Sequence, residues 1–170
     1  MLFLVKVFVL PYNGIMLTEE KVAHQLLQTK KTLSVAESCT GGLLAHRLTN
    51  IPGSSAFLKA GIVSYSNDAK IKLLKVKPEL IKKNGAVSPE VAMAMAQGAQ
   101  KMHKTDFGIG ITGIAGPDGG TKQKPLGLVY IAVHTREGET LCAKCQFKGT
   151  RANIKKQAST QALRFLSEFL

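Results

Sequence analysis

The sequence predicts a single α/β domain, a three-layer α/β/α sandwich with a mixed, mostly parallel sheet of about five strands. Apolar stretches of strand length alternate with amphipathic stretches of helix length, a pattern typical of a parallel sheet with helices on both faces. The last two expected strands are joined by the short turn Arg136-Glu137-Gly138, so that pair is antiparallel. The length of 170 residues, with 45% hydrophobic and 20% charged residues, is that of one ordinary globular domain.

Helix caps and breakers mark the elements of the first half of the chain. Thr18 offers a capping hydroxyl and is followed by Glu19 and Glu20, acids that favour the positive end of a helix dipole. Asn67 is the expected cap of a further helix, and Pro78 stands at a favoured first-turn position. Helices are therefore expected over residues 18–31, 42–50 and 67–74 and from 78 onward, and strands over residues 32–36 and 60–65.

The second half holds the clearest helix start, Ser88-Pro89-Glu90, which combines a cap, a first-turn proline and an acid. Thr150 is expected to cap the last helix, whose apolar side chains recur at helical spacing. Helices are therefore expected over residues 88–103 and from 150 onward, and strands over residues 106–112, 127–135 and 141–147.

Residues 1–16 form an amino-terminal extension whose opening stretch is apolar and carries Lys6. That stretch is too short to span a bilayer, and no basic segment precedes it as in a signal peptide. We expect either an extra edge strand or an upstream translation start, because Met16 stands directly before the first helix. One domain is then expected over residues 17–170. Three cysteines, an odd number without disulfide-like spacing, predict a reducing, cytoplasmic location.

The chain is strongly basic. It has 23 Lys and Arg residues against 11 Asp and Glu, a net charge of +12 and a pI near 9.8. This balance favours encounter with anions such as nucleic acid, an acidic surface or a phosphorylated metabolite. The excess is mostly Lys scattered over expected helix faces, without an Arg-rich run or interleaved aromatics. Nucleic acid and membranes are therefore not the expected partners.

Polar and glycine-rich segments follow three of the expected strands. These are Glu37 to Gly42, Ser64 to Lys70 and Thr112 to Gly120. In open α/β sheets, ligands bind outside the carboxyl ends of the strands. The three segments are therefore the expected walls of one site.

Ser38 is the candidate nucleophile, since a serine between a strand and a helix exposes its hydroxyl at the helix start. Backbone N–H groups there, such as those of Cys39 and Thr40, could hold an oxyanion, and Gly41 and Gly42 allow close approach. The alternative is that Ser38 or Thr40 merely caps the helix. The sequence lacks a G-x-S-x-G elbow, and none of its four histidines follows a comparable strand, so a Ser-His-Asp triad is not supported.

Lys70 is the candidate base, because lysine replaces histidine in some serine amidases. It falls in the first turn of its expected helix, where the dipole and partial burial both lower a lysine pKa. Tyr65 could relay the proton or hold substrate. The alternative for Lys70 is an exposed lysine among many. Cys39 is a rival nucleophile, because a helix start lowers a thiol pKa.

The remaining motifs carry weaker signals. The segment from Thr112 through Gly113 and Gly116 lacks the lysine and hydroxyl of a P-loop, yet it could line a pocket or present N–H groups to phosphate. Arg151 starts the last helix, where a bound phosphate would offset its repulsion by the dipole. Cys142 and Cys145 would point to opposite faces of a strand, so no metal site is expected.

Four blocks in order give the sequence a family resemblance: Ser34–Gly42, Gly61–Lys70, Gly85–Glu90 and Gly113–Gly120. Together they resemble the CinA carboxy-terminal domain, the nicotinamide-nucleotide amidase family. The resemblance covers about residues 17–170. It implies a three-layer fold and hydrolysis of the carboxamide of nicotinamide mononucleotide to the acid and ammonia.

The resemblance also implies roles for individual residues. Ser38 would be the nucleophile with Lys70 and Tyr65 as its helpers, and Arg151 would lie near the substrate phosphate. No metal or organic cofactor is expected, the expected partner is a pyridine nucleotide, and a homo-oligomer is expected. The residues expected at the substrate are Glu37, Cys39, Thr40, Gly41, Gly42, Asn67, Thr112, Gly113, Gly116 and Arg151.

Two alternatives to an amidase stay open. One is a non-catalytic nucleotide-binding module, associated with competence or DNA damage, that keeps the pocket without the chemistry. The other is a nucleic-acid binder that uses its basic surface.

Overall fold

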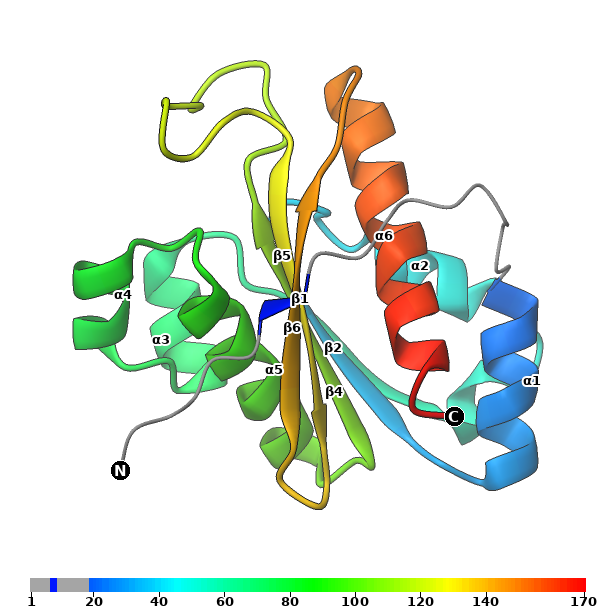
Figure 1. The fold of residues 1–170 in the computed structure, drawn as a ribbon. Coiled ribbons are helices and arrows are strands. Elements are labelled where there is room, and N and C mark those ends of the chain that lie inside the picture. The colour runs from blue at the N-terminus through cyan, green and yellow to red at the C-terminus, as the bar shows by residue number, and fades with distance from the viewer. Residues whose placement is uncertain (1–6, 9–18) are drawn as a thin grey trace.

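A six-stranded mixed sheet forms the middle layer of the structure, a computed structural model that describes residues 7–8 and 19–170 (Figure 1). Its strands are β1 (Val7–Phe8), β2 (Leu33–Glu37), β3 (Leu58–Val63), β4 (Phe107–Gly113), β5 (Leu128–Thr135) and β6 (Thr140–Gln146). Their order is β1-β6-β5-β4-β2-β3. β2 is parallel to β3 and β4, and β1 is parallel to β6, whereas β5 is antiparallel to both neighbours. The mixed, mostly parallel sheet is confirmed.

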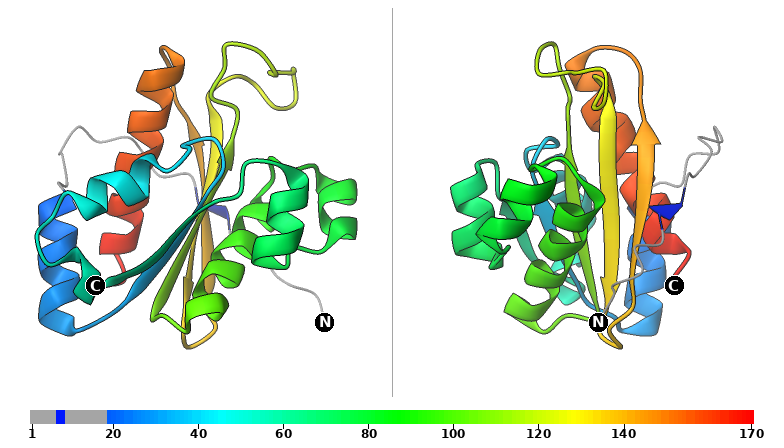
Figure 2. Two further views of the ribbon diagram at one scale, coloured as in Figure 1. Left: turned by 180° about the vertical axis from the view of Figure 1, so that it is seen from behind. Right: turned by 60° about the vertical axis from the view of Figure 1, so that its left-hand side comes forward.

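Helices cover both faces of the sheet, as Figure 2 shows from two further directions. On one face lie α1 (Glu19–Thr29), α2 (Leu43–Thr49) and α6 (Arg151–Ser167), and on the other α3 (Asn67–Leu74), α4 (Pro78–Asn84) and α5 (Pro89–His103). A short 3-10 helix, η1 (Ser54–Ala56), leads into β3. Each face has its own buried apolar cluster. The three-layer architecture is therefore confirmed as well.

Glycine lets α5 lie directly on the central strand β4. A Cβ atom on Gly110 would stand 2.2 Å from the carbonyl oxygen of Ala92 in α5. Any side chain there would push the helix off the sheet. The alternation of glycine with isoleucine in β4 is thus a packing requirement of this layer.

The predicted helix starts are confirmed at Ser88 and Thr150. The Ser88 hydroxyl accepts a hydrogen bond from the Val91 N–H at 3.3 Å, and the Thr150 hydroxyl accepts one from the Asn153 N–H at 3.3 Å. The prediction that Asn67 caps α3 is wrong. Ser66 is the cap, since its hydroxyl accepts from the Ala69 N–H at 3.0 Å, and Asn67 is the first helical residue.

Strand β3 begins and ends two residues earlier than expected. It starts at Leu58 because that residue pairs with Leu33 of β2. It ends at Val63 because the next two residues, Ser64 and Tyr65, turn their carbonyl groups toward a lysine amine. The end of the strand is thus set by the site that follows it.

The amino-terminal extension is described only at β1, where Val7 lies opposite Cys142 and Phe8 opposite Ala143. The rest of residues 1–16, the domain boundary at residue 17 and the capping role of Thr18 lie outside the described residues.

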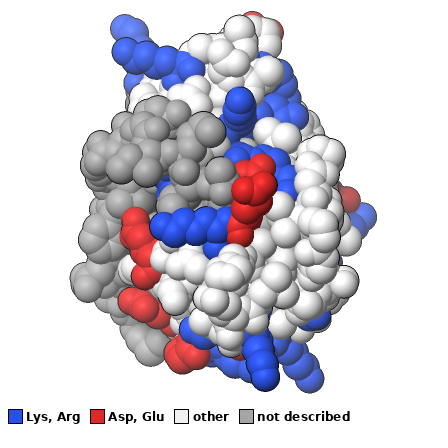
Figure 3. All heavy atoms as spheres, turned by 90° about the vertical axis from the view of Figure 1, so that its right-hand side faces the viewer, with Lys and Arg blue, Asp and Glu red and all other residues white. Residues whose placement is uncertain are grey.

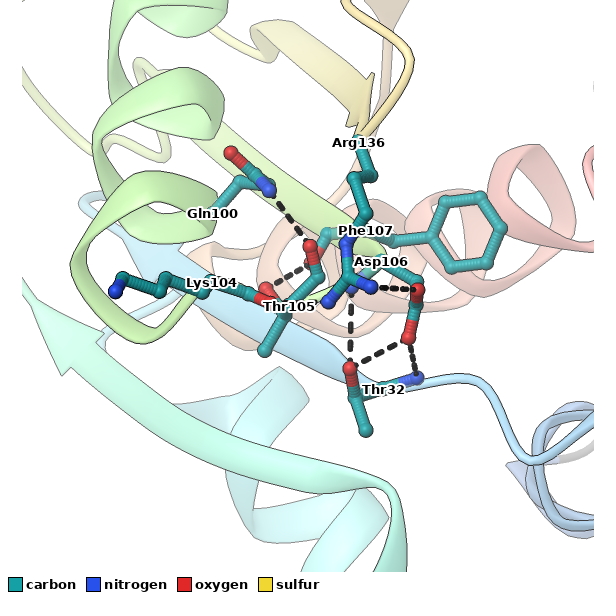
Figure 4. A network of polar contacts seen from close by, with 7 residues as sticks. All are labelled: Thr32, Gln100, Lys104, Thr105, Asp106, Phe107 and Arg136. Carbon is teal, nitrogen blue, oxygen red and sulfur yellow. Dashed lines mark hydrogen bonds and ion pairs between the residues drawn. The ribbon is translucent and has the colours of Figure 1, made fainter.

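A polar network joins β2 and β4 where both strands begin (Figure 4). One Asp106 carboxylate oxygen accepts hydrogen bonds from the Thr32 N–H at 2.8 Å and the Thr32 hydroxyl at 2.7 Å. Arg136 lies 3.3 Å from the other carboxylate oxygen. Burial alone would raise the pKa of Asp106, but the hydrogen bonds from Thr32 hold it below its usual range. The network holds β2 and β4 in register where the two strands begin. Their carboxyl ends therefore lie side by side at the opposite edge of the sheet.

Candidate active site

The carboxyl ends of β2, β3 and β4 meet at one edge of the sheet, because the three strands are parallel neighbours. The Ser38 N–H donates to the Ile111 carbonyl of β4 at 2.9 Å, and the Ser64 N–H donates to the Glu37 carbonyl at 2.8 Å. The three polar segments expected from the sequence therefore lie side by side. Their contacts define a candidate active site around Ser38.

The turn from β2 into α2 carries Ser38. Its hydroxyl side chain is 9% exposed, and its carbonyl accepts from the Gly41 N–H at 3.1 Å. Gly41 and Gly42 have φ angles of 62° and 92°, in the left-handed region that favours glycine. The two glycines are thus required by the backbone that presents Ser38.

Glu37 caps helix α2 from inside the protein. The residue is fully buried, and its carboxylate accepts hydrogen bonds from the N–H groups of Gly42 at 3.0 Å, Leu44 at 3.1 Å and Ala45 at 2.8 Å. The alternative that Ser38 or Thr40 caps this helix is therefore wrong. The expectation that Glu37 contacts substrate is replaced by a role in holding the turn, because its carboxylate is occupied.

Lys70 is 1% exposed, so the alternative of an ordinary surface lysine is wrong. Its Nζ atom lies 3.0 Å from the Ser38 hydroxyl, 2.8 Å from the Ser64 carbonyl and 3.3 Å from the Tyr65 carbonyl. Burial lowers the pKa of the Lys70 amine, because the charged form loses its hydration. The expected direction of this pKa shift is confirmed.

The three oxygen atoms around the amine, those of Ser38, Ser64 and Tyr65, fix its orientation. A neutral amine has two N–H bonds and one lone pair. When the two carbonyl groups of Ser64 and Tyr65 take the N–H bonds, the lone pair faces the Ser38 hydroxyl. The neutral Lys70 amine is thus placed to accept the hydroxyl proton.

Two buried hydroxyl groups flank this pair. Among the described residues, the hydroxyls of Thr40 and Ser64 have no hydrogen-bond partner. Such groups are uncommon in protein interiors, and the described residues include two further ones away from this edge, Ser34 and Thr135. The sequence analysis named Ser64 only as the start of a polar segment, although this residue directly follows β3 and stands six positions before Lys70.

Arg151 joins α6 to the other segments of the site. Its guanidinium donates to the Tyr65 hydroxyl at 2.8 Å and to the Gly116 carbonyl at 2.6 Å. Tyr65 is 59% exposed, so its ring lies at the mouth of the site while its carbonyl contacts Lys70. The structure thus places Tyr65 and Arg151 together, with Arg151 within electrostatic reach of Cys39.

The remaining predicted residues lie around the same edge. Thr112 is buried and donates its hydroxyl to the Ala86 carbonyl at 2.8 Å, which ties β4 to the segment before α5. Gly113 leaves no room for a side chain, since a Cβ atom would stand 2.6 Å from the Leu128 carbonyl oxygen. Asn67 is exposed at the start of α3. These contacts give Thr112 and Gly113 structural reasons for their positions.

Cys39 is a weaker rival than expected. The helix start was expected to lower its thiol pKa, but burial raises the pKa of Cys39 to about 12. The expectation overlooked that the thiol turns into the core, where the thiolate loses its hydration. A protonated, 7% exposed thiol is a poor nucleophile.

His134, Cys142 and Cys145 lie in or beside the sheet core, and His46 of α2 lines a groove together with Arg151. His134 is buried, donates to or accepts from the Thr140 hydroxyl at 2.7 Å, and pairs in the sheet with Gly108 at the beginning of β4, away from Ser38. Cys142 and Cys145 belong to different core clusters, on opposite faces of the sheet. Within residues 19–170, no group of three or more His, Cys, Asp and Glu side chains could hold a metal ion.

A groove of about 1060 Å³ lies beside the site, between α1, α2 and α6. Arg151 belongs to its lining, whereas Ser38 and Lys70 do not. Basic and acidic side chains lie close together on this face (Figure 3), and Arg47 forms an ion pair with Glu19 at 2.8 Å. Arg151 is thus shared by the groove lining and the contacts with Tyr65 and Gly116.

Comparison with known proteins identifies the family. The model of the CinA C-terminal domain matches residues 16–170, most of the chain. The chain belongs to the CinA C-terminal domain family. A CinA superfamily protein from Escherichia coli has a solved structure with a TM-score of 0.87 and 33% identity, covering 96% of each chain. A competence/damage inducible protein from Agrobacterium tumefaciens gives a TM-score of 0.84 at 39% identity, covering 88% of this chain and 94% of that one.

Curated relatives in the CinA family are longer than this chain. A protein of Moorella thermoacetica, named as competence-damage inducible, is 55% identical over 150 residues, which are 88% of this chain and 36% of that protein. A CinA-like protein of Kosmotoga olearia is 48% identical over 152 residues, which are 89% of this chain and 37% of that protein. The chain thus spans little more than a third of these relatives. Within the described residues, no helix has the length and apolar character needed to cross a bilayer.

Proposed function

We propose that the chain is a nicotinamide-nucleotide amidase, which hydrolyses the carboxamide of nicotinamide mononucleotide to the carboxylic acid and ammonia. The observation that carries the proposal is the 3.0 Å contact between the Lys70 amine and the Ser38 hydroxyl in a buried site. A serine beside a neutral lysine is a general arrangement for acyl transfer. Family membership and the Arg151 guanidinium at the mouth of the site support an anionic substrate.

The first half of the reaction transfers the acyl group to the enzyme. The Ser38 oxygen attacks the amide carbon while its proton passes to the Lys70 Nζ atom. The tetrahedral intermediate then breaks its carbon–nitrogen bond, and the departing nitrogen takes the proton from Lys70 and leaves as ammonia. An ester on Ser38 remains.

The second half restores the enzyme. Water attacks the ester carbon and gives a proton to Lys70. The carbon–oxygen bond to Ser38 breaks, and Ser38 regains the proton from Lys70. The product acid leaves, and the Lys70 amine is neutral again.

The oxyanion of both tetrahedral intermediates needs hydrogen-bond donors close to Ser38. Glu37 already occupies the N–H groups of Gly42, Leu44 and Ala45. The N–H groups of Cys39 and Thr40, which precede them in the turn, are therefore the proposed donors. Arg151 is proposed to bind the substrate phosphate, since its guanidinium can form two parallel hydrogen bonds to phosphate oxygens.

Ammonia release from nicotinamide mononucleotide tests the proposal. The Ser38→Ala variant is expected to lose about 1000-fold or more of the rate, because no other group can form the ester. Cys39→Ala is the matched control in the same turn and is expected to keep most of the activity. Activity that survives Ser38→Ala but disappears in Cys39→Ala would overturn the serine assignment.

The names of the relatives refer to competence and damage, and the alternative is a nucleotide-binding module without chemistry. This alternative predicts binding of nicotinamide mononucleotide without release of ammonia from any pyridine nucleotide or simple amide. Calorimetric binding together with the ammonia assay therefore separates the two functions.

A further inference from the structure

We propose that the Ser64 hydroxyl holds the water molecule that hydrolyses the ester on Ser38, which makes Ser64 a further catalytic residue in the second half of the reaction. The inference rests on the acyl-enzyme route of the proposed function and deepens it, because it assigns a residue to the step that follows the release of ammonia. It arises from the position of Ser64 in the sheet relative to the nucleophile and the base.

Ser64 continues the pairing of β3 with β2 beyond the last residue of each strand. Glu37 lies opposite Val63 in the parallel register, and the Ser64 N–H donates to the Glu37 carbonyl at 2.8 Å. Ser38 directly follows β2, and its own N–H still donates to the Ile111 carbonyl of β4 at 2.9 Å. Neighbouring strands lie about 4.8 Å apart, so the backbones of Ser38 and Ser64 are adjacent at this edge of the sheet.

The side chains of Ser38 and Ser64 face the same side of the sheet, because side chains alternate between the two faces along a strand. Ala36 and Ile62, two residues before the two serines, are partners in the register. Both pack in the apolar cluster between the sheet and α3, α4 and α5. The two serine hydroxyls therefore lie on the face from which Lys70 of α3 reaches Ser38.

The backbone of Ser64 also contacts the base. Its carbonyl accepts from the Lys70 Nζ atom at 2.8 Å, and the same atom lies 3.0 Å from the Ser38 hydroxyl. Ser64 is fully buried, yet its hydroxyl has no hydrogen-bond partner among the described residues. A hydroxyl can donate one hydrogen bond and accept two. This unused hydrogen-bonding capacity lies beside both the base and the nucleophile.

Ser34 carries a hydroxyl that is equally buried and that also has no partner in the part of the chain that the structure describes. It lies on the same face of β2 as the Ser38 side chain, but four residues earlier, about 13 Å along the strand. Ser64 therefore differs from Ser34 in its neighbours, the nucleophile and the base. Ser34 is the matched control for the experiment below.

The water that attacks the ester has to lose one proton and direct a lone pair at the ester carbon. One of its O–H bonds points to the Lys70 lone pair, which takes the proton as the new carbon–oxygen bond forms. The second O–H bond needs an acceptor, which the Ser64 hydroxyl supplies. The tetrahedral intermediate then breaks its bond to the Ser38 oxygen, which regains the proton from Lys70, and the acid leaves. Removal of the Ser64 hydroxyl therefore slows this half and spares the formation of the ester.

The activated ester p-nitrophenyl acetate tests this inference without a nucleotide. It acetylates Ser38 with release of p-nitrophenol, and hydrolysis of the acetyl ester then limits turnover. The unchanged protein is expected to give a stoichiometric burst of p-nitrophenol followed by a slower steady rate. In Ser64→Ala the burst should remain, whereas the steady rate should fall about 10- to 100-fold. Ser64→Thr, which keeps the hydroxyl, should restore most of the steady rate, and Ser34→Ala should behave like the unchanged protein.

Thermal unfolding of the same variants separates loss of the hydroxyl from loss of the fold. Ser64→Ala and Ser34→Ala should melt no lower than the unchanged protein, because each removes a buried hydroxyl without a partner. The inference is overturned by an unchanged steady rate in Ser64→Ala, by an equal fall in Ser34→Ala, by loss of the burst in Ser64→Ala, or by the absence of a burst from the unchanged protein. A burst with a Ser64-dependent steady rate, but no ammonia release from nicotinamide mononucleotide, would support the inference and contradict the proposed substrate.

Discussion

The guanidinium of Arg151 donates a hydrogen bond to the hydroxyl of Tyr65 at 2.8 Å, and it joins the start of the last helix to the segment that follows β3. The same segment supplies Lys70 and the two carbonyl groups that orient its amine. The proposed phosphate site and the proposed base are therefore connected through one residue. The Tyr65 hydroxyl contacts Arg151 at the proposed phosphate site, and the Tyr65 backbone carbonyl contacts Lys70, the proposed base.

Tyr65→Phe separates these two connections. The backbone carbonyl still accepts from Lys70, but Arg151 loses one acceptor and its fixed position. We expect kcat/KM for the nucleotide to fall about 10-fold, mainly through KM, with an unchanged dependence on pH. Steady-state kinetics over a pH series measures this, and a shifted pH profile would instead show that the hydroxyl relays the proton.

The activity should depend on the ionisation of Lys70. Because burial lowers its pKa, the base is neutral at a lower pH than an ordinary lysine. The value of kcat/KM is therefore expected to rise with pH and to level off below the usual titration range of lysine. Lys70→Arg, which stays charged, should be inactive across the whole series. An unchanged rate in Lys70→Arg would exclude Lys70 as the base.

Glu37 is expected to stabilise the turn through its charge. Glu37→Gln keeps the shape but weakens three hydrogen bonds and brings an amide N–H group close to backbone N–H groups. We expect the free energy of unfolding to fall by about 1–3 kcal/mol, with a loss of kcat because Ser38 is less well held. Denaturant unfolding and ammonia release measure the two effects.

Glu79→Gln is the matched control for Glu37. Glu79 lies in the first turn of helix α4, and its side chain is exposed, whereas Glu37 ends β2 and is buried. Its replacement should change the free energy of unfolding by only a few tenths of a kcal/mol. Equal losses in the two variants would show that the buried contacts of Glu37 add nothing.

Asp106 should make the stability of the fold depend on acid. Its pKa is lowered in the folded protein, so its contribution is complete above the ordinary pKa of aspartate and is lost as pH falls through the folded value. Asp106→Asn is expected to cost about 1–2 kcal/mol at pH 7 and progressively less below pH 4. Asp68→Asn, in an exposed pair with Lys72, should have little effect at either pH.

Much of the architecture followed from local signals in the sequence. Ser88 and Thr150 cap their helices as expected, because a hydroxyl before a helix satisfies its free N–H groups wherever the helix packs. The short turn at residues 136–138 predicted that the two strands that it joins are antiparallel, and β5 and β6 confirm this prediction. The strand-end rule brought Ser38 and Lys70 together, because it depends only on the parallel order of neighbouring strands.

The errors concern side chains whose direction depends on packing. Glu37 was expected at the substrate, yet it turns inward onto α2, and no local pattern distinguishes these two directions. The pKa of the Cys39 thiol was expected to be lowered by the helix start, yet burial raises it. The turn sequence alone does not indicate that this thiol is buried.

The position of β3 at the border of the sheet has a consequence for how activity and folding are related. Among the described strands, β3 pairs with β2 alone, and the segment after it carries the proposed base, Lys70. Detachment of this one strand would remove Lys70 from Ser38 while β2, β4, β5 and β6 stay paired. The proposed active site is therefore expected to come apart at a lower temperature or denaturant concentration than the rest of the fold. Activity would then be lost before the domain unfolds, and it would return without refolding of the whole domain.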